Sequence, residues 1–222
     1  MTRVAFTDIA PPSKVLAIGL NYADHAGEQN VTPPAAPLIF VKTNNSICYD
    51  GDEIRWAAAD SSQVDYEAEL AVVIGTKARR VSEADALDYV FGYTCCNDVS
   101  ARDAQFGDKQ WVRGKSFDTF CPLGPHIVTA DEIPDPQTLA IACRVNGETL
   151  QEANTSQMIF GVAQLIAYCS RFMTLEVGDI IATGTPSGVG FARNPPIFLK
   201  AGDVCEIDIE KIGVLRNACV VE

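Results

Sequence analysis

The chain has 222 residues, 47% of them hydrophobic, and a formal net charge of −12 at pH 7. The negative charge argues against nucleic acid as the main partner, because phosphate binding needs a basic surface. The apolar runs are too short to span a membrane, and the N-terminal residues lack the apolar core of a secretory signal. We therefore expect a cytoplasmic protein with no membrane partner.

The predicted elements, taken in chain order, are mostly short strands. Apolar or alternating runs predict strands at 15–20, 38–42, 53–56, 64–74, 90–96, 139–145, 175–183, 204–209 and 213–220. Helical signals are fewer and fall at 82–89, 100–106 and 155–172, with Ser100 expected to cap the second and Asn154 or Thr155 the third. Most strands are joined by turns, such as Asn146-Gly147, rather than by helices. This pattern favours a β-rich, mixed α+β fold over a doubly wound sheet.

The domain organisation follows from the length. We expect a single catalytic domain over 1–222, with 1–14 as an N-terminal arm or edge strand. The chain has 8 cysteines and 2 histidines. Because no two cysteines have the CxxC spacing, a zinc site is improbable, and we expect reduced, buried thiols.

The stretch 64–75, VDYEAELAVVIG, carries acids at alternate positions. Alternate side chains of a strand point to the same face, so Asp65, Glu67 and Glu69 are expected to lie together. Burying unpartnered carboxylates is costly, and a cation is the simplest partner. Oxygen ligands without histidine or cysteine select Mg²⁺ or Mn²⁺, with Ca²⁺ as a substitute. A solvated acidic edge strand is the competing interpretation.

Other candidate residues lie in four further segments. Asp98 follows the strand at 90–96 and can reach a neighbouring strand, although a turn or cap role is common for aspartate. His25 and Glu28 share one face of a helical turn, where the carboxylate would orient the imidazole as a general base; a surface pair is the alternative. Lys115 lies among aromatic residues and could pair with a substrate anion, or be solvated. The loop 183–190, TGTPSGVG, could cradle a carboxylate with its N–H groups, or be a plain turn.

In combination these segments resemble the fumarylacetoacetate hydrolase superfamily. The matching motifs, in chain order, are VLAIGLNYADHAGE, PLIFVKTNNSI, VDYEAELAVVIG, VFGYTCCNDVSARDAQF, GKSFDTFCPLGP and GDIIATGTPSGVG. The resemblance covers 13–222 and is closest to the small single-domain branch of acylpyruvate hydrolases, oxaloacetate decarboxylases or tautomerases, and hydroxyheptadienedioate isomerases. It implies a β-roll of mixed sheets with a few short helices, and a homodimer.

The resemblance also implies roles for individual residues. The metal ligands would be Glu67, Glu69 and Asp98, with Asp65 behind them. The catalytic residues would be His25, Glu28 and Lys115. Substrate oxygens would be held by Arg102, Gln105 and Thr185. Larger members have one more acidic ligand upstream of the histidine, but Asn21 and Asp24 have a different spacing here, so no fourth ligand is assigned.

The implied activity is divalent-metal-dependent cleavage of a C–C bond in a 2,4-dioxo acid. Acylpyruvate hydrolysis or oxaloacetate decarboxylation ranks first, because the His25–Glu28 pair is intact. An isomerase or tautomerase of 2-oxo or 2-hydroxy-enoic diacids ranks second, and a non-catalytic metal-binding protein is the alternative from a different class. The expected partner is a small 2-oxo acid. All three reactions of such acids share an enolate, so the sequence does not choose among them.

Overall fold

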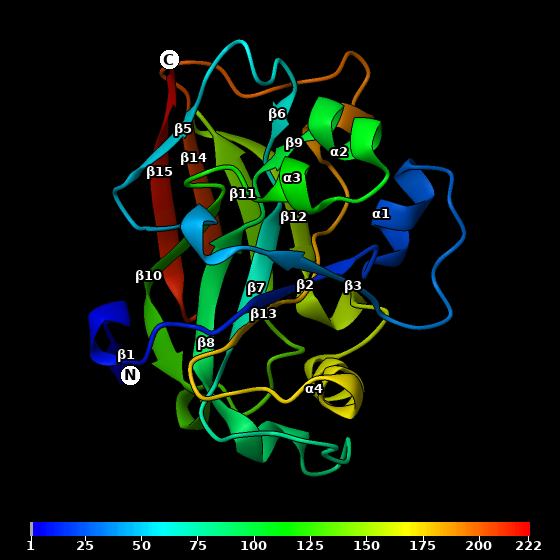
Figure 1. The fold of residues 1–222 in the computed structure, drawn as a ribbon, viewed down its shortest axis with the longest axis vertical. Coiled ribbons are helices and arrows are strands. Elements are labelled where there is room, and N and C mark those ends of the chain that lie inside the picture. The colour runs from blue at the N-terminus through cyan, green and yellow to red at the C-terminus, as the bar shows by residue number, and fades with distance from the viewer. Residues whose placement is uncertain (1) are drawn as a thin grey trace.

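The computed structural model describes residues 2–222, whose strands form three sheets (Figure 1). The larger sheet has eight strands: β1 (Arg3–Val4), β2 (Val15–Gly19), β3 (Leu38–Lys42), β4 (Ile47–Tyr49), β7 (Ala68–Ile74), β8 (Val90–Asn97), β10 (Cys121–Thr129) and β13 (Ile180–Ala182). The second sheet has five: β5 (Glu53–Trp56), β11 (Ala140–Val145), β12 (Glu148–Asn154), β14 (Val204–Ile209) and β15 (Gly213–Val221). The remaining pair is β6 (Val64–Asp65) and β9 (Ser100–Ala101).

Helices are short and lie around the sheets. The α-helices are α1 (Ala23–Glu28), α2 (Arg102–Asp108), α3 (Val112–Lys115) and α4 (Val162–Phe172). The 3₁₀ turns are η1 (Phe6–Asp8), η2 (Asn44–Ser46), η3 (Ala86–Tyr89), η4 (Ala130–Glu132), η5 (Thr155–Gln157) and η6 (Gly190–Ala192). The expected β-rich, mixed α+β class with a few short helices is confirmed.

Both large sheets mix parallel and antiparallel neighbours. The larger runs in the order β1-β10-β8-β7-β13-β2-β3, with β4 beside β10, and the second runs β12-β11-β14-β15-β5. The pairs β13–β2, β10–β4 and β15–β5 are parallel. Strand β1 pairs with β10 and lies at one edge of the larger sheet. An edge strand was one of the two forms expected for the segment before β2.

The core lies between the two large sheets, where β7 and β8 pack against β11, β14 and β15. Leu70 and Val72 of β7 point into this core with Ile141, Ile207 and Leu215 from the second sheet, and all are buried. Successive side chains of a strand alternate between faces, so the acid that precedes Leu70 points to the opposite face. On that side α1, α2 and α3 gather around the sheet (Figure 1).

The predicted strand at 64–74 is divided. The structure has β6 and β7 with Tyr66 and Glu67 between them, and β6 pairs with β9 instead of continuing the large sheet. Asp65 Oδ1 accepts the N–H of Tyr66 at 2.9 Å and that of Gly190 at 2.7 Å. A side chain that binds its own neighbouring backbone competes with ladder bonds, which explains the break.

The predicted helix at 155–172 is also divided, into η5 and α4. Asn154 caps the first turn, as expected, by accepting from the N–H of Ser156 at 2.9 Å. The intervening backbone then turns away because Ile159 N–H donates to the Asn21 carbonyl at 2.7 Å and Phe160 N–H to the Asn21 side chain at 2.9 Å. Binding to Asn21 therefore interrupts a sequence with good helical periodicity.

Other boundaries differ by a few residues. Ser100 lies in β9 rather than capping a helix, and α2 begins at Arg102. The predicted helix at 82–89 forms only the turn η3, although Ser82 Oγ donates to Asp85 at 2.6 Å in the expected cap pattern. The predicted strand at 175–183 is limited to β13.

Candidate active site

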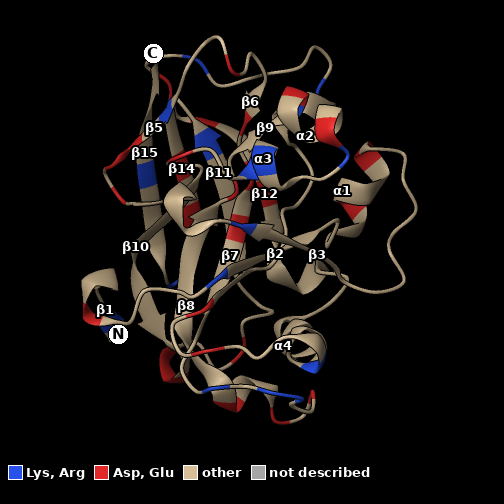
Figure 2. Ribbon diagram, viewed as in Figure 1, with Lys and Arg blue, Asp and Glu red and all other residues tan. Residues whose placement is uncertain are grey.

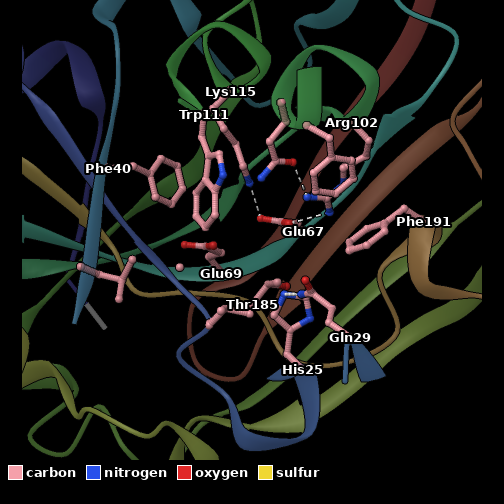
Figure 3. Close-up of a pocket in the computed structure, with 15 residues that line it drawn as sticks. His25, Gln29, Phe40, Glu67, Glu69, Arg102, Trp111, Lys115, Thr185 and Phe191 are labelled. Carbon is pink, nitrogen blue, oxygen red and sulfur yellow. Dashed lines mark hydrogen bonds and ion pairs between the residues drawn. The ribbon is translucent and has the colours of Figure 1, made fainter. Parts of the chain in front are cut away.

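A small cavity of about 60 Å³ lies among α1, α2, α3 and the start of β7 (Figure 3). Its polar lining consists of His25, Gln29, Glu67, Glu69, Arg102, Gln105, Lys115 and Thr185. Its apolar lining includes Ile18, Phe40, Phe106, Trp111 and Phe191. Every predicted site residue except Glu28 and Asp98 lines this cavity. Those two lie directly behind it, each bonded to a residue that does.

The three predicted metal ligands meet at one place. Oxygen atoms of Glu67, Glu69 and Asp98 lie within 4.8 Å of one another, and all three side chains are buried. The backbone brings them together, because Asp98 N–H donates to the Glu67 carbonyl at 2.9 Å and Glu67 N–H donates to Asn97 Oδ1 at 3.0 Å. The predicted meeting of the strand acids with Asp98 is thus present in the fold.

Basic side chains from three other elements bind these acids. Figure 2 marks basic residues on α3 and acidic residues on β7, and Figure 3 shows Lys115 and Arg102 reaching Glu67. Lys115 Nζ lies 2.7 Å from an oxygen of Glu67 and 2.7 Å from one of Asp98. Arg102 reaches the other Glu67 oxygen at 2.6 Å, and Lys42 reaches the other Asp98 oxygen at 2.5 Å. A metal ion, which the sequence indicated as the simplest partner of these acids, is therefore not their main source of positive charge, because protein cations balance most of it.

Glu69 is the exception. Among residues 2–222 no basic side chain forms an ion pair with it, and one oxygen accepts only the N–H of Gly184, at 2.9 Å. Burial raises the pKa of Glu69 well above its ordinary value, and the charges of Asp98 and Glu67 raise it further. Burial would also raise the pKa of Glu67, but Lys115 and Arg102 hold it well below its usual range. A buried, unbalanced carboxylate in an all-oxygen cluster fits a hard divalent cation.

Arg102 links Glu67 of the acidic cluster to Asp65 and Gln105. Its Nε donates to Asp65 at 2.9 Å, one terminal nitrogen donates to Gln105 at 3.0 Å, and its guanidinium lies 4.4 Å from the centre of the Phe191 ring. Burial would lower the pKa of Arg102, but Glu67 and Asp65 raise it. These bonds direct most of the N–H donors of Arg102 to protein carboxylates and to Gln105. The expected roles of Arg102 and Gln105 in holding substrate oxygens stay predictions.

The histidine pair forms as the helical spacing predicts. His25 Nδ1 lies 2.6 Å from Glu28 Oε1, and the other Glu28 oxygen accepts the N–H of Gly188 at 2.8 Å. Gln29, which the sequence analysis did not identify, lies 2.8 Å from His25 Nε2. Its position four residues after the histidine was the available signal, because such residues share a helix face.

The glycine-rich loop binds the protein's own acids. Backbone N–H groups of Gly184, Gly188 and Gly190 donate to Glu69, Glu28 and Asp65 respectively. This loop therefore does cradle carboxylates, as the sequence suggested, and those carboxylates belong to the site itself.

Gln151, a second residue that the sequence motifs did not indicate, orients Thr185. Gln151 Nε2 donates to Thr185 Oγ1 at 2.8 Å, while Gln151 Oε1 accepts the N–H of Ala68 at 2.9 Å. Since the Thr185 oxygen is occupied as an acceptor, its proton is free to be donated into the cavity.

The apolar wall of the cavity depends on a glycine at position 19. Trp111 packs edge-on against Phe40 with ring centres 5.2 Å apart, and a Cβ placed on Gly19 would lie 2.7 Å from the Trp111 ring. Lys115 Nζ lies 5.2 Å from the centre of the Phe40 ring. Glycine at position 19 thus lets Trp111 close one side of the cavity, a role that the sequence alone did not indicate.

A β-rich fold that buries carboxylates beside a histidine–carboxylate pair is suited to an acid–base enzyme. The chain belongs to the fumarylacetoacetate hydrolase family, because the family model described as Fumarylacetoacetate (FAA) hydrolase C-terminal matches residues 14–221. The family and branch expected from the motifs are confirmed, and so is the prediction of an enzyme. Cleavage of a C–C bond stays a prediction.

The relatives name more specific activities. The chain is 53% identical over 214 residues to "Oxaloacetate tautomerase fahd2, mitochondrial" of Xenopus laevis, covering 96% of this chain and 67% of that protein. It is 50% identical over 225 residues to "Oxaloacetate tautomerase FAHD2A, mitochondrial" of Homo sapiens, covering 99% and 71%. A crystal structure of 2-hydroxyhepta-2,4-diene-1,7-dioate isomerase from Mycobacterium marinum matches with a TM-score of 0.84 and 45% identity, covering 97% and 77%.

Two findings bear on where the protein is located. Within residues 2–222, no helix has the length and apolar character needed to cross a bilayer. The vertebrate relatives are named as mitochondrial. The expected cytoplasmic location stays a prediction.

Proposed function

We propose that the protein is an oxaloacetate tautomerase, which interconverts the enol and keto forms of a small 2-oxo diacid. The observation that carries the proposal is His25, oriented by Glu28 at 2.6 Å and facing the same cavity as the acidic cluster. The names of the vertebrate relatives support this choice. It takes precedence over C–C cleavage, which the motifs alone ranked first.

The size of the cavity supports a small substrate. The cavity volume of about 60 Å³ is small, which favours a compact diacid over a long acyl chain. Lys115 offers three N–H donors, of which two bind Glu67 and Asp98. The third is available to a substrate oxygen, as is the hydroxyl proton of Thr185.

We propose that Glu67, Glu69 and Asp98 hold Mg²⁺ or Mn²⁺, with Ca²⁺ as a substitute. When bound, such an ion would draw electron density from the 2-oxo group and stabilise an enolate. Glu69 would contribute the carboxylate that no basic side chain pairs with in the described part of the chain. Asp65 would remain behind the site, where it fixes Arg102.

His25 is the proposed proton carrier. Because the Glu28 carboxylate can only accept, neutral His25 keeps its proton on Nδ1 and its lone pair on Nε2. From the keto form, Nε2 takes a proton from C3, the C3–H electron pair forms the C2–C3 double bond, and the carbonyl pair moves to the C2 oxygen. Lys115 donates a hydrogen bond to that oxygen. Transfer of the proton from Nε2 to the C2 oxygen gives the enol and returns neutral His25, and the same steps in reverse return the keto form.

C–C cleavage is the second candidate, because a histidine positioned to carry a proton can also activate water. Oxaloacetate decarboxylation would release pyruvate, whereas tautomerisation would not. The proposed small-molecule partner is therefore a 2-oxo acid in both cases. The expected homodimer and single-domain organisation stay predictions.

The test is to add enol-oxaloacetate to the protein with Mg²⁺ and follow loss of the enol by its ultraviolet absorbance, while a coupled assay detects pyruvate. We expect enol loss to be accelerated without matching pyruvate, and to fall at least a hundredfold in His25→Gln. Pyruvate formed as fast as the enol is lost would favour decarboxylation. No turnover, with a chelator changing only the melting temperature, would leave a non-catalytic metal-binding protein.

A further inference from the structure

Gln29 occupies the reactive nitrogen of His25. The Gln29 side-chain nitrogen lies 2.8 Å from His25 Nε2, and both side chains line the cavity (Figure 3). His25 Nδ1 is bonded to Glu28 at 2.6 Å, so both ring nitrogens have protein partners in the absence of substrate. Removal of a proton from carbon requires a free lone pair on Nε2, and the Gln29 amide binds this lone pair.

The direction of this hydrogen bond follows from Glu28. An ionised carboxylate accepts only, so neutral His25 donates from Nδ1 and accepts at Nε2. Gln29 must then present its NH₂ group to Nε2, which is the arrangement in the structure. Glu28 is fixed in turn by the N–H of Gly188 at 2.8 Å, and helix α1 is further held by Ser187, which donates to Asp24 at 2.8 Å.

We propose that Gln29 is a positioning residue that holds Nε2 of His25 as a hydrogen-bond acceptor in the substrate-free enzyme and gives up this position to the reacting carbon. The role in the reaction rests on the proposed function, whereas the contact with His25 does not. Gln29 is suited to the exchange because it is half-buried at the cavity wall and uncharged. Water, which hydrolysis would require at the same nitrogen, is displaced from Nε2 until substrate arrives.

Several charged groups also face His25 and must be considered in any titration. They are Asp24 and Glu28 on α1, Glu67 and Glu69 at the start of β7, Arg102 on α2 and Lys115 on α3. None of them changes in a substitution at position 29. A shift in the titration of His25 between variants at that position therefore reports the contact with residue 29.

The contact is tested by ¹⁵N NMR of the imidazole nitrogens in the full chain with Mg²⁺. The chain has only 2 histidines, and His126→Gln, in β10 and outside the cavity, leaves His25 as the single signal. In Gln29→Glu the new carboxylate only accepts, so it stabilises a proton on Nε2, and the midpoint of the His25 titration should rise by about one pH unit, a tenfold change in proton affinity. Gln29→Met is the uncharged control and should not raise it.

The kinetic consequence is tested with enol-oxaloacetate. In Gln29→Met the substrate no longer displaces a bonded amide, so KM should fall about threefold or more while kcat stays within about threefold of wild type. In Gln29→Glu, where Nε2 keeps its proton, kcat should fall at least about tenfold. This opposite pair of changes is not expected from a residue that only supports the fold.

The outcomes separate the two proposals. If Gln29→Glu and Gln29→Met both titrate as wild type, the contact is absent in solution and the inference is overturned. If Gln29→Met instead raises KM and lowers kcat, Gln29 is a substrate ligand and the positioning role is overturned. If wild type turns over no enol while the NMR shift is seen, the tautomerase proposal fails and the hold of Gln29 on His25 stands.

Discussion

Lys42 and Asp98 form an ion pair with no access to solvent: Nζ of Lys42 lies 2.5 Å from Oδ1 of Asp98, and both side chains are fully buried. Lys42 also donates to the carbonyl of Val99 at 3.2 Å. The pair joins the end of β3 to the segment after β8. It therefore fixes the Asp98 carboxylate through one oxygen, while Lys115 binds the other.

Lys42→Met should lower the free energy of unfolding by about 3 kcal/mol or more, because it leaves a buried carboxylate with one cation fewer. The measurement is urea denaturation of Lys42→Met, Asp98→Asn and the double variant. We expect the double variant to lose clearly less than the sum of the single losses. Additive losses would show that the two side chains do not interact in solution.

Glu67→Gln and Glu69→Gln should have opposite effects on the metal-free protein. Glu67 balances Arg102 and Lys115, so its neutralisation should cost about 3 kcal/mol or more. Glu69 forms no ion pair with a basic side chain of residues 2–222, and its ionisation is opposed by burial, so Glu69→Gln should be at least as stable as wild type.

Both variants should bind Mn²⁺ at least about tenfold more weakly, as measured by electron paramagnetic resonance. Denaturation is compared in the presence of a chelator, so that metal binding does not contribute. Equal destabilisation by the two substitutions would contradict the charge balance described for this cluster.

Gly19→Ala should affect activity much more than stability. The added Cβ would lie 2.7 Å from the end of the Trp111 ring, which can move aside, so the free energy of unfolding should change by about 1 kcal/mol or less. The displaced ring would alter the cavity, and kcat/KM should fall at least about tenfold. Gly107→Ala, on α2 with open space around its Cβ position, is the matched control and should keep wild-type kcat/KM.

Asp179 should make stability depend on acid pH. This buried carboxylate accepts from the N–H and Oγ of Ser13 at 2.9 and 2.7 Å and from the N–H of Glu176 at 2.8 Å, and it pairs with Lys14. Burial would raise the pKa of Asp179, but Lys14 and these donors hold it below its ordinary value. The unfolded chain therefore binds the proton more tightly, and the stabilisation is lost as pH falls through the folded pKa.

The comparison is between wild type and Asp179→Asn. Above the ordinary aspartate pKa of about 3.9, wild type should be more stable by about 1–3 kcal/mol. The difference should shrink as the pH is lowered below that value in urea denaturation. A difference that is constant or larger at low pH would refute the role of the charge.

The strands and the acidic cluster could be predicted because their signals are local. Glu67 and Glu69 are two residues apart before an apolar run, and that spacing alone brings their side chains near each other. The break at Tyr66 could not be predicted, because it depends on Asp65 accepting a bond from Gly190, more than a hundred positions away in the chain. The division of the helix before Val162 has the same kind of cause, since Asn21 supplies the competing bonds.

Partners of the site residues were harder to predict than the residues themselves. Lys42 is the last residue of an apolar strand, a position where a lysine side chain is expected to be solvated, yet the fold buries it against Asp98. Gln29 lies four residues after His25, a spacing that allows contact, but the same spacing is equally compatible with a solvated side chain. The charge balance of the cluster depends on such contacts, which is why the sequence overstated the need for a metal ion.

The most direct test of the acidic cluster is anomalous diffraction from crystals of the wild-type protein soaked in Mn²⁺. We predict one strong anomalous peak within bonding distance of carboxylate oxygens of Glu67, Glu69 and Asp98. A fully soaked crystal with no peak among these three side chains, and Lys115 still bound to both Glu67 and Asp98, would contradict the assignment.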